Sequence, residues 1–209
     1  MDCLLCYNDS NEIYSGVYEC THCHLVFKNP ETFLDANTEE ARYSNHQNNI
    51  EDQGYVDFLG RLLKPLKTFL PRSFTGLDYG CGPGPTLSEL LSREGGEMEN
   101  YDPIFFPDAH LLISDFYNVV TCTEVVEHFK HPAYDWNKLV DVLCDGGLLG
   151  IMTQFYSKDI DYQKWWYKND PTHVVFYQQE TFAYIESKFS LRIIYNDKNS
   201  VVIFKKIEM

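Results

Sequence analysis

Three ionisable side chains follow an apolar stretch of the chain. In TCTEVVEHFKHP, the end of the apolar stretch NVVTC is followed by Glu124, Glu127 and His128. Charged groups at the mouth of an apolar strand are unfavourable unless a partner or a ligand uses them. If a helix begins where the strand ends, residues i and i+3 share one face and residue i+4 lies beside them. Two carboxylates and an imidazole would then converge, and such mixed ligands suit Mg²⁺, Mn²⁺, Fe²⁺ or Zn²⁺.

The same residues also have a metal-free interpretation. Glu124 would then accept hydrogen bonds from a neighbouring loop, and His128 would only pack beneath the helix. The residue types and their spacing do not decide between the two interpretations.

A glycine-rich turn lies upstream of this cluster. LDYGCGPG carries Gly80, Gly82 and Gly84, with Asp78 two residues before the first glycine. Glycines let the backbone approach a ligand closely, and a helical pattern begins at once. The spacing differs from the dinucleotide pattern G-x-G-x-x-G. Asp102, in NYDP, closes the next strand, where a carboxylate can bind both hydroxyls of a ribose. Taken alone, the glycine turn also fits a plain tight turn or an NAD site.

Four cysteines form two C-x2-C pairs, separated by thirteen residues, near the start of the sequence. They are Cys3, Cys6, Cys20 and Cys23. This spacing is typical of a tetrahedral structural zinc site, in which four thiolates fill the coordination sphere and leave no position for a substrate. So small a ribbon buries little core, so metal binding would supply its folding free energy. The alternatives are four unrelated buried cysteines, or His22 or His24 in place of one thiolate; we expect both histidines to face solvent.

The elements that position these residues follow from the apolar pattern. Short strands on either side of a glycine turn predict a ribbon over residues 1–29. A polar linker and a helical cover segment follow over residues 30–73, with a helix over 53–70 that Pro65 kinks or splits. Alternating strands and helices over residues 74–209 predict an α/β fold, Rossmann-like and doubly wound, with a mostly parallel sheet. An antiparallel hairpin that turns at residues 198–199 closes it.

Composition limits the classes of partner. The formal net charge of −14 disfavours a general nucleic-acid binder, because a negative field repels phosphates. The hydrophobic share of 44% allows a sizeable core, and no apolar run approaches membrane-spanning length. The start of the sequence lacks the basic and apolar regions of a signal peptide, and we expect a cytoplasmic protein.

The motifs LDYGCGPG, YDP, CTEVVEH and GGLLGIMT, in this order, resemble a class I S-adenosylmethionine-dependent methyltransferase over residues 74–209. The ribbon and linker resemble a bacterial subgroup with a cysteine-rich N-terminal segment. The resemblance implies that Asp78 meets the methionine amino group and that Asp102 binds the ribose. The cofactor site that it implies comprises Asp78, Gly80, Cys81, Gly82, Gly84, Asp102, Pro103, Thr121, Cys122 and Thr123.

One departure from that family concerns the adenine end of the site. The family usually has a third strand that ends in an acidic residue near adenine. Here FFPDAHLLISDF is short and interrupted by proline, so the resemblance does not establish this strand. Asp108 or Asp115 would take the acidic role, and the sequence does not choose between them.

The string E-x-x-E-H is also similar to that of ubiquinone-pathway O-methyltransferases and small-RNA 2′-O-methyltransferases. In both, the matching Glu, Glu and His bind a metal, and His173 of DPTHVVFYQQETF stands where the RNA enzymes have a further histidine. A bound divalent metal would lower the pKa of an acceptor hydroxyl. Without metal, the candidate general bases are His173, then His46 in a polar segment that forms a lid or a solvated loop. Trp165, Trp166 and Tyr167 would line a substrate pocket or simply pack.

The resemblance and the charge together favour a methyltransferase that acts at oxygen on a small-molecule acceptor. The cofactors would be S-adenosylmethionine, structural zinc and, in the metal-dependent interpretation, a second divalent ion. One rival is an RNA 2′-O-methyltransferase, which the net charge opposes. Another is a non-catalytic module that senses the cofactor and uses the ribbon for protein contacts.

Overall fold

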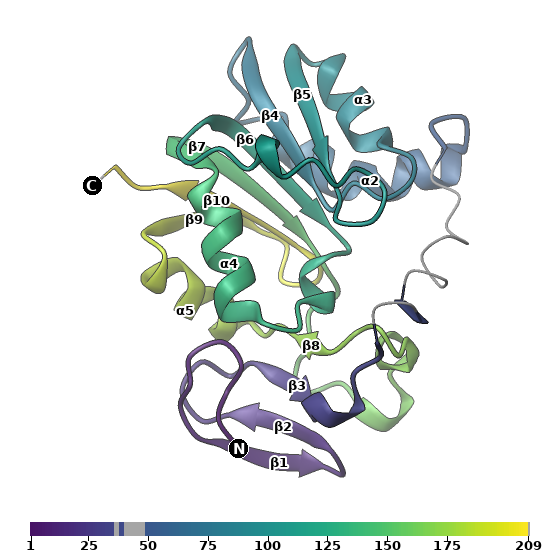
Figure 1. Cartoon of the computed structure of the whole chain (residues 1–209), viewed down its shortest axis with the longest axis vertical. Helices are drawn as coiled ribbons and strands as arrows, with labels where there is room; N and C mark the ends of the chain where they lie inside the picture. Colours follow the sequence, from purple (N-terminus) through teal and green to yellow (C-terminus); the bar gives the residue numbers. More distant parts are fainter. Residues whose placement is uncertain (36–37, 40–48, 209) are drawn as a thin grey trace.

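The computed structural model describes residues 1–35, 38–39 and 49–208. Its centre is a six-stranded sheet with the order β5-β4-β6-β7-β10-β9 (Figure 1). The strands are β4 Phe74–Tyr79, β5 Gly96–Tyr101, β6 Tyr117–Thr123, β7 Leu143–Met152, β9 Leu191–Asn196 and β10 Val201–Lys206. Strand β4 is parallel to β5 and β6, and β6 is parallel to β7. Strand β10 runs antiparallel to both β7 and β9, so the predicted mostly parallel sheet with a closing hairpin is confirmed.

Helices cover both faces of this sheet, as a doubly wound fold requires. They are α2 Gln53–Leu66, α3 Thr86–Ser92, α4 Pro132–Asp141 and α5 Gln179–Lys188. The leucines of α2 and α3 share one buried cluster with the sheet. Trp136 of α4 and Phe182 of α5 belong to a second cluster. The two clusters are the cores on the two faces of the sheet. Among the described residues, no helix combines the length and the apolar character needed to cross a bilayer.

Helix α2 ends earlier than its sequence pattern predicts, and helix α4 is followed directly by a strand. Helix α2 begins at the N-cap Asp52, whose carboxylate accepts from the amides of Gly54 and Tyr55. It ends at Leu66 rather than residue 70, with Pro65 in its last turn, because proline offers no N–H to continue the bonding. Helix α4 ends at Asp141 because the chain from Leu143 onward pairs with β6 instead.

The segment between β5 and β6 contains no third parallel strand. Residues 103–116, all of which are described, hold one short 3₁₀ turn, Ala109–Leu111, and an isolated bridge from Asp102 to Phe106. Strand β5 is therefore the edge of the sheet on this side. The proline-interrupted sequence explains this, because proline cannot donate to a strand ladder.

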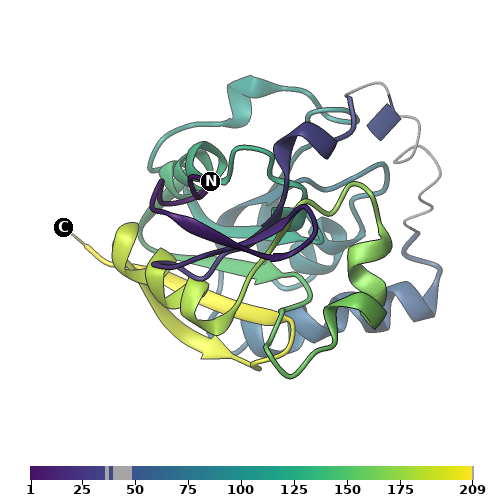
Figure 2. The ribbon, with the colours of Figure 1, turned by 90° about the horizontal axis from the view of Figure 1, so that it is seen from below.

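The N-terminal ribbon forms a second sheet together with a strand from far along the chain. Its own strands are β1 Ser10–Tyr14, β2 Val17–Cys20 and β3 Val26–Lys28, with a turn at Gly16 between the first two. Strand β8, Val175–Phe176, pairs antiparallel with β3 and completes the order β1-β2-β3-β8. Figure 2 views the molecule from the end that carries this ribbon. The shared sheet joins the ribbon to the larger part of the chain, and the predicted boundaries at residues 29 and 73 stay predictions.

Candidate active site

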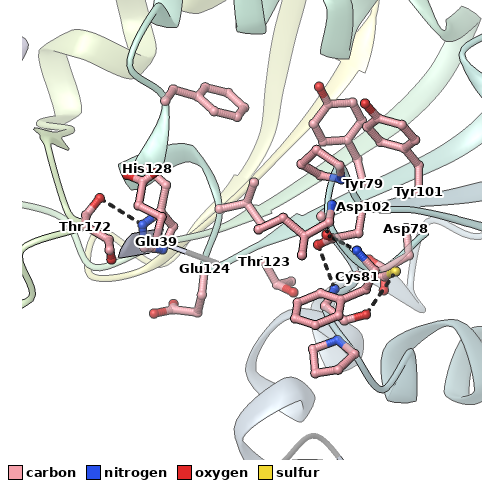
Figure 3. A pocket seen from close by; sticks show the side chains of 18 of the residues that line it. Glu39, Asp78, Tyr79, Cys81, Tyr101, Asp102, Thr123, Glu124, His128 and Thr172 are labelled. Carbon is pink, nitrogen blue, oxygen red and sulfur yellow. Dashed lines mark hydrogen bonds between the residues drawn. The ribbon is translucent and has the colours of Figure 1, made fainter. Parts of the chain in front are cut away.

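A cleft of about 1060 Å³ opens at the carboxyl ends of β4, β5 and β6. Ligands of open α/β sheets bind at this edge, where neighbouring connections diverge to opposite faces. Figure 3 shows its two ends: Asp78, Cys81 and Asp102 lie at one, His128 and Thr172 at the other, and Glu124 lies between them. Aromatic side chains of α2, Tyr55 and Phe58, also line the cleft.

The glycine turn has the backbone conformation that its sequence predicts. Gly80 and Gly82 have φ values of 77° and 66°, in the left-handed region that favours glycine. A Cβ on Gly80 would lie 2.4 Å from a methyl carbon of Val125, so the turn packs directly against the segment after β6. The two halves of the cleft are therefore in contact at this glycine.

We expect Gly80→Ala to lower the free energy of unfolding by about 1–3 kcal/mol, through the left-handed backbone and the clash with Val125. Urea denaturation measures this change. The double variant with Val125→Ala should recover the part that is due to the clash. Gly60→Ala in α2 is the matched control, because its Cβ would meet only a lysine carbon at 3.5 Å; it should be neutral or stabilising. Equal losses at both glycines would contradict the prediction.

Two carboxylates stand at this end of the cleft. Asp78 is buried, and Thr121 donates its hydroxyl hydrogen to it over 2.7 Å. Burial raises the pKa of Asp78 to about 6; the charge of Asp102 adds to the rise and the Thr121 bond opposes it. Asp102 accepts from three backbone amides, those of Gly82, Ile104 and Phe105. Asp102 thus ties the glycine turn to the end of β5.

Most of the predicted cofactor residues line the cleft, and two do not. The lining members are Asp78, Gly80, Cys81, Gly82, Gly84, Asp102, Pro103 and Thr123. Thr121 and Cys122 are fully buried: the first supports Asp78 from within the sheet, and the second belongs to the core on the α4 side. They lie deeper in β6, where successive side chains alternate between the two faces of the sheet. Only the strand end reaches the cleft.

Neither candidate for the adenine-side acid lines the cleft. The carboxylate of Asp108 accepts from the amide of His110 and caps the 3₁₀ turn. Asp115 precedes β6, at the amino ends of the parallel strands, and forms an ion pair with Lys206 at 2.6 Å. The described part of the cleft therefore receives no carboxylate from the segment that replaces the third strand.

The residues after β6 form a 3₁₀ turn, Val126–His128, rather than the expected α-helix. Glu124 has a left-handed backbone with φ of 54°, which separates it from the turn. Glu127 is fully buried, and one of its oxygens is buried without a hydrogen-bond partner among the residues that the structure describes. Glu127, His128 and His173 each offer one ligand atom, and these atoms lie within 4.8 Å of one another. Glu124 does not belong to this group of three.

Two ring nitrogens in this group donate to backbone carbonyls. Nδ1 of His128 lies 2.9 Å from the carbonyl of Thr172, and Nδ1 of His173 lies 2.8 Å from that of Tyr167. A carbonyl only accepts, so each Nδ1 carries a proton, and in a neutral ring the lone pair is then on Nε2. Burial lowers the pKa of His173, which favours its neutral form. Both imidazoles are therefore in the tautomer that can ligate a metal or accept a proton through Nε2.

The sequence analysis named Tyr167 only as a pocket-lining or packing residue and did not predict its contact with the two glutamates. Its hydroxyl donates to Glu127 over 2.6 Å and lies 3.2 Å from Glu124. Burial, and then the charge of Glu127, raise the pKa of Glu124 to about 8. The neighbouring Trp166 is 68% exposed whereas Tyr167 is 2% exposed, so only one of the pair is a pocket wall open to solvent. No local pattern distinguishes the two aromatics. The other candidate base, His46, lies outside the described residues.

The four cysteine sulfurs of the ribbon gather at one point. Sγ of Cys3 lies 3.5 Å from Sγ of Cys23, and Sγ of Cys6 lies 3.3 Å from Sγ of Cys20. Backbone amides donate to two of the sulfurs, as from Leu5 to Cys3. The cysteines are free thiols, and the four can hold a metal ion. His22 and His24 are not in this group.

Comparison with known proteins agrees with this architecture. The sequence profile of a family described as a methyltransferase domain matches residues 46–195. The chain therefore belongs to this methyltransferase family. Together with the fold, this makes it a class I S-adenosylmethionine-dependent methyltransferase, and hence an enzyme. No match was found among curated proteins.

Solved structures share the fold at low sequence identity. A chain of the complex between the Haloferax volcanii Trm112 methyltransferase activator and a methyltransferase has a TM-score of 0.57 at 12% identity, over 81% of this chain and 97% of that one. A Listeria monocytogenes S-adenosylmethionine-dependent methyltransferase has a TM-score of 0.52 at 13% identity, over 72% of this chain and 98% of that one. CalO1, a methyltransferase of calicheamicin biosynthesis in its SAH-bound form, has a TM-score of 0.54 at 14% identity, over 82% of this chain and 58% of that one.

Proposed function

We propose that the protein transfers a methyl group from S-adenosylmethionine to an oxygen of a small-molecule acceptor, assisted by a divalent metal. The observation that carries this proposal is the group formed by Glu127, His128 and His173 at one end of the cleft. Its carboxylate and imidazole donors suit a divalent ion. The cleft connects this group with the glycine turn, so donor and acceptor sites would share one cavity.

The donor end of the cleft fits the methyl donor in volume and in charge. Asp78 is a buried carboxylate that a cationic amino group would stabilise, and the glycine turn leaves room beside it. Asp102 holds that turn in place through its bonds to backbone amides. When bound, S-adenosylmethionine supplies a sulfonium methyl group for an in-line displacement. The chain orients the acceptor and excludes water from the buried end of the cleft.

The acceptor end fits a metal for three reasons. The buried oxygen of Glu127 that lacks a partner is one that a cation would satisfy. The two imidazoles are held with their lone pairs on Nε2. The carbonyls that bind their Nδ1 hydrogens are the outer partners that ligating histidines usually have. A metal held by these residues would lower the pKa of an acceptor hydroxyl.

A small acceptor agrees better with this cleft than RNA does. The formal net charge is −14, and acidic side chains of Asp78, Asp102 and Glu124 line the cavity. Tyr55, Phe58 and the exposed Trp166 offer flat apolar walls for an aromatic or sugar-like ligand. We propose zinc for the four-cysteine group of the ribbon, since four sulfur ligands close the site and favour a structural role.

Isothermal titration with S-adenosylhomocysteine and Mn²⁺ tests the two halves of the site separately. Transfer of labelled methyl from S-adenosylmethionine to small molecules of a cell extract, with and without Mn²⁺, tests the reaction. We expect binding of both ligands and metal-dependent labelling of a low-molecular-weight product. Binding of neither the demethylated donor nor the donor itself would contradict the proposal; labelling that a chelator leaves unchanged would contradict its metal.

We expect Asp78→Asn to weaken donor binding roughly 10–100-fold, because a charged hydrogen bond to the amino group is lost. The same change should stabilise the ligand-free protein. The folded-state pKa of about 6 lies above the ordinary value of 3.8, so Asp78 destabilises the fold increasingly as the pH rises from about 4 to 6, and fully above 6. The penalty amounts to about 3 kcal/mol and is relieved as the pH falls from 6 towards 4. Urea denaturation at pH 5 and pH 8 should show a larger gain for the variant at pH 8. Unchanged affinity would remove Asp78 from the donor site.

A further inference from the structure

Four backbone carbonyls in a six-residue segment, 167–172, accept hydrogen bonds from three basic side chains. These carbonyls belong to Tyr167, Lys168, Asp170 and Thr172. The outer two accept from the imidazoles of His173 and His128. The inner two accept from the ammonium group of one lysine, Lys28, over 3.0 Å and 3.1 Å. One segment therefore connects both candidate catalytic histidines to this lysine.

Lys28 belongs to the ribbon and not to the sheet that forms the cleft. It is the last residue of β3, and its own backbone amide donates to the carbonyl of Val174. The pairing of β3 with β8 holds the lysine against the segment. Burial lowers the pKa of Lys28 to about 8. An ammonium group is unfavourable in such a place unless polar atoms replace its water, and the two carbonyls do so.

The direction of these carbonyls decides which nitrogen of each imidazole holds the proton. Neutral histidine in water has no fixed geometry and favours the Nε2-protonated tautomer, so a partner must impose the Nδ1-protonated one. For His128 and His173 the partners are the first and last carbonyls of residues 167–172. If the ammonium partner were lost, the carbonyl of Lys168 would turn towards water, and that of Asp170 would keep the backbone amide of His173 as a partner. The short segment would then move with the carbonyl of Lys168.

We propose that Lys28 is a positioning residue, through which the cysteine ribbon holds His128 and His173 in their Nδ1-protonated state. Through Lys28 the ribbon would then affect the acceptor end of the cleft, where His128 and His173 lie. Lys28 does not contact the donor end at the glycine turn. The chemical roles of the two histidines rest on the proposed function. Their tautomers do not, and can be measured without a substrate.

The test compares Lys28→Met with Lys158→Met in the full chain, with the ribbon metal in place and no divalent ion added for the group of Glu127, His128 and His173. Methionine keeps the apolar stem of Lys28 and removes its charge and its hydrogen bonds. Lys158 is the matched control, because it also contacts the ribbon, at Glu19 over 3.5 Å, but is 71% exposed in its side chain. Long-range ¹⁵N–¹H spectra report the tautomer of each imidazole, and His128→Gln and His173→Gln assign the signals. Hydrogen exchange of peptides over residues 165–176 reports how readily the backbone of the segment 167–172 opens.

In the wild type and in Lys158→Met we expect both histidines to be protonated at Nδ1. In Lys28→Met we expect signals of both to shift towards the Nε2-protonated form, with exchange over residues 165–176 faster by on the order of tenfold. Affinity for S-adenosylhomocysteine should change less than about twofold. Lys28→Arg, which keeps a charged donor for the carbonyls, should restore the tautomers.

Unchanged tautomers in a folded Lys28→Met protein would overturn the inference, and so would an equal effect of Lys158→Met. If Lys28→Met does not fold, Lys28→Gln replaces it, and the same spectra decide. The tautomer comparison is valid even if the wild type binds no methyl donor. Failure of this inference is therefore distinguishable from failure of the proposed function.

Discussion

Glu127→Gln is expected to reduce methyl transfer by on the order of 10²–10⁴-fold while the affinity for S-adenosylhomocysteine stays within about twofold. The substitution keeps the shape of a fully buried side chain and removes its charge. Tyr167 can still donate to the remaining oxygen, so the packing should survive. A neutral amide is a poor ligand for a divalent ion, so Mn²⁺ affinity should fall by on the order of 10²-fold or more. Titration calorimetry with Mn²⁺ gives this result without any acceptor.

Two matched variants make the Glu127 prediction specific. Glu99→Gln, an exposed residue of β5, removes the same charge far from the group of three and should change nothing. Glu124→Gln should weaken Mn²⁺ binding much less than Glu127→Gln, because Glu124 lies beside Tyr167 and outside that group. The reverse order of the two effects would contradict the assignment of the ligands. Undiminished turnover by Glu127→Gln would contradict a chemical role for this end of the cleft.

Loss of the ribbon metal is the second change for which we expect a large effect. Cys20→Ser removes one of the four sulfurs from a fully buried position, where its Sγ accepts from two backbone amides. A ligand present at a thousand times its dissociation constant stabilises the folded state by about 4 kcal/mol. For a chain of this size that loss lowers Tm by roughly 8–16 °C. The ribbon residues share a buried cluster with Trp136 and the sheet, so the destabilisation should reach the whole chain.

Cys144→Ser is the control for the ribbon prediction. Cys144 lies in β7, outside the four-sulfur group, and should leave both Tm and metal content unchanged. Elemental analysis of the purified protein should find one tightly held metal in the wild type, lost in Cys20→Ser. A wild type without metal, or a Cys20→Ser protein as stable as Cys144→Ser, would show that the sulfurs have no such role.

Much of the fold was predictable because it depends on residues that lie close together in the sequence. The glycine turn, the paired cysteines and the hairpin at residues 198–199 depend on backbone conformations and spacings within a few residues. The sequence analysis also recognised that residues 103–116 do not establish a third strand, because proline cannot donate to a strand ladder. Helix ends were less predictable: α4 gives way to β7 at Leu143 because that residue pairs with Tyr117, which no local pattern reveals.

At the candidate site, the structure brings together three of the four residues that the sequence analysis grouped and leaves out Glu124. An α-helical turn would have placed Glu124, Glu127 and His128 together. The chain instead makes a 3₁₀ turn after a left-handed Glu124, which removes this glutamate from the group. Such a turn depends on the packing of Val126 in the core rather than on local propensity.

The sequence by itself determined the class of fold, the glycine turn beside Asp78 and the four-cysteine group, because each depends on neighbours along the chain. Only the tertiary structure decided how the ribbon joins the cleft. Two residues of β8 pair with β3 from the other end of the chain, and Lys28 then reaches the carbonyls beside His173. A strand of two residues is too short to show a hydrophobic pattern in the sequence. It forms because the edge of β3 is available for pairing.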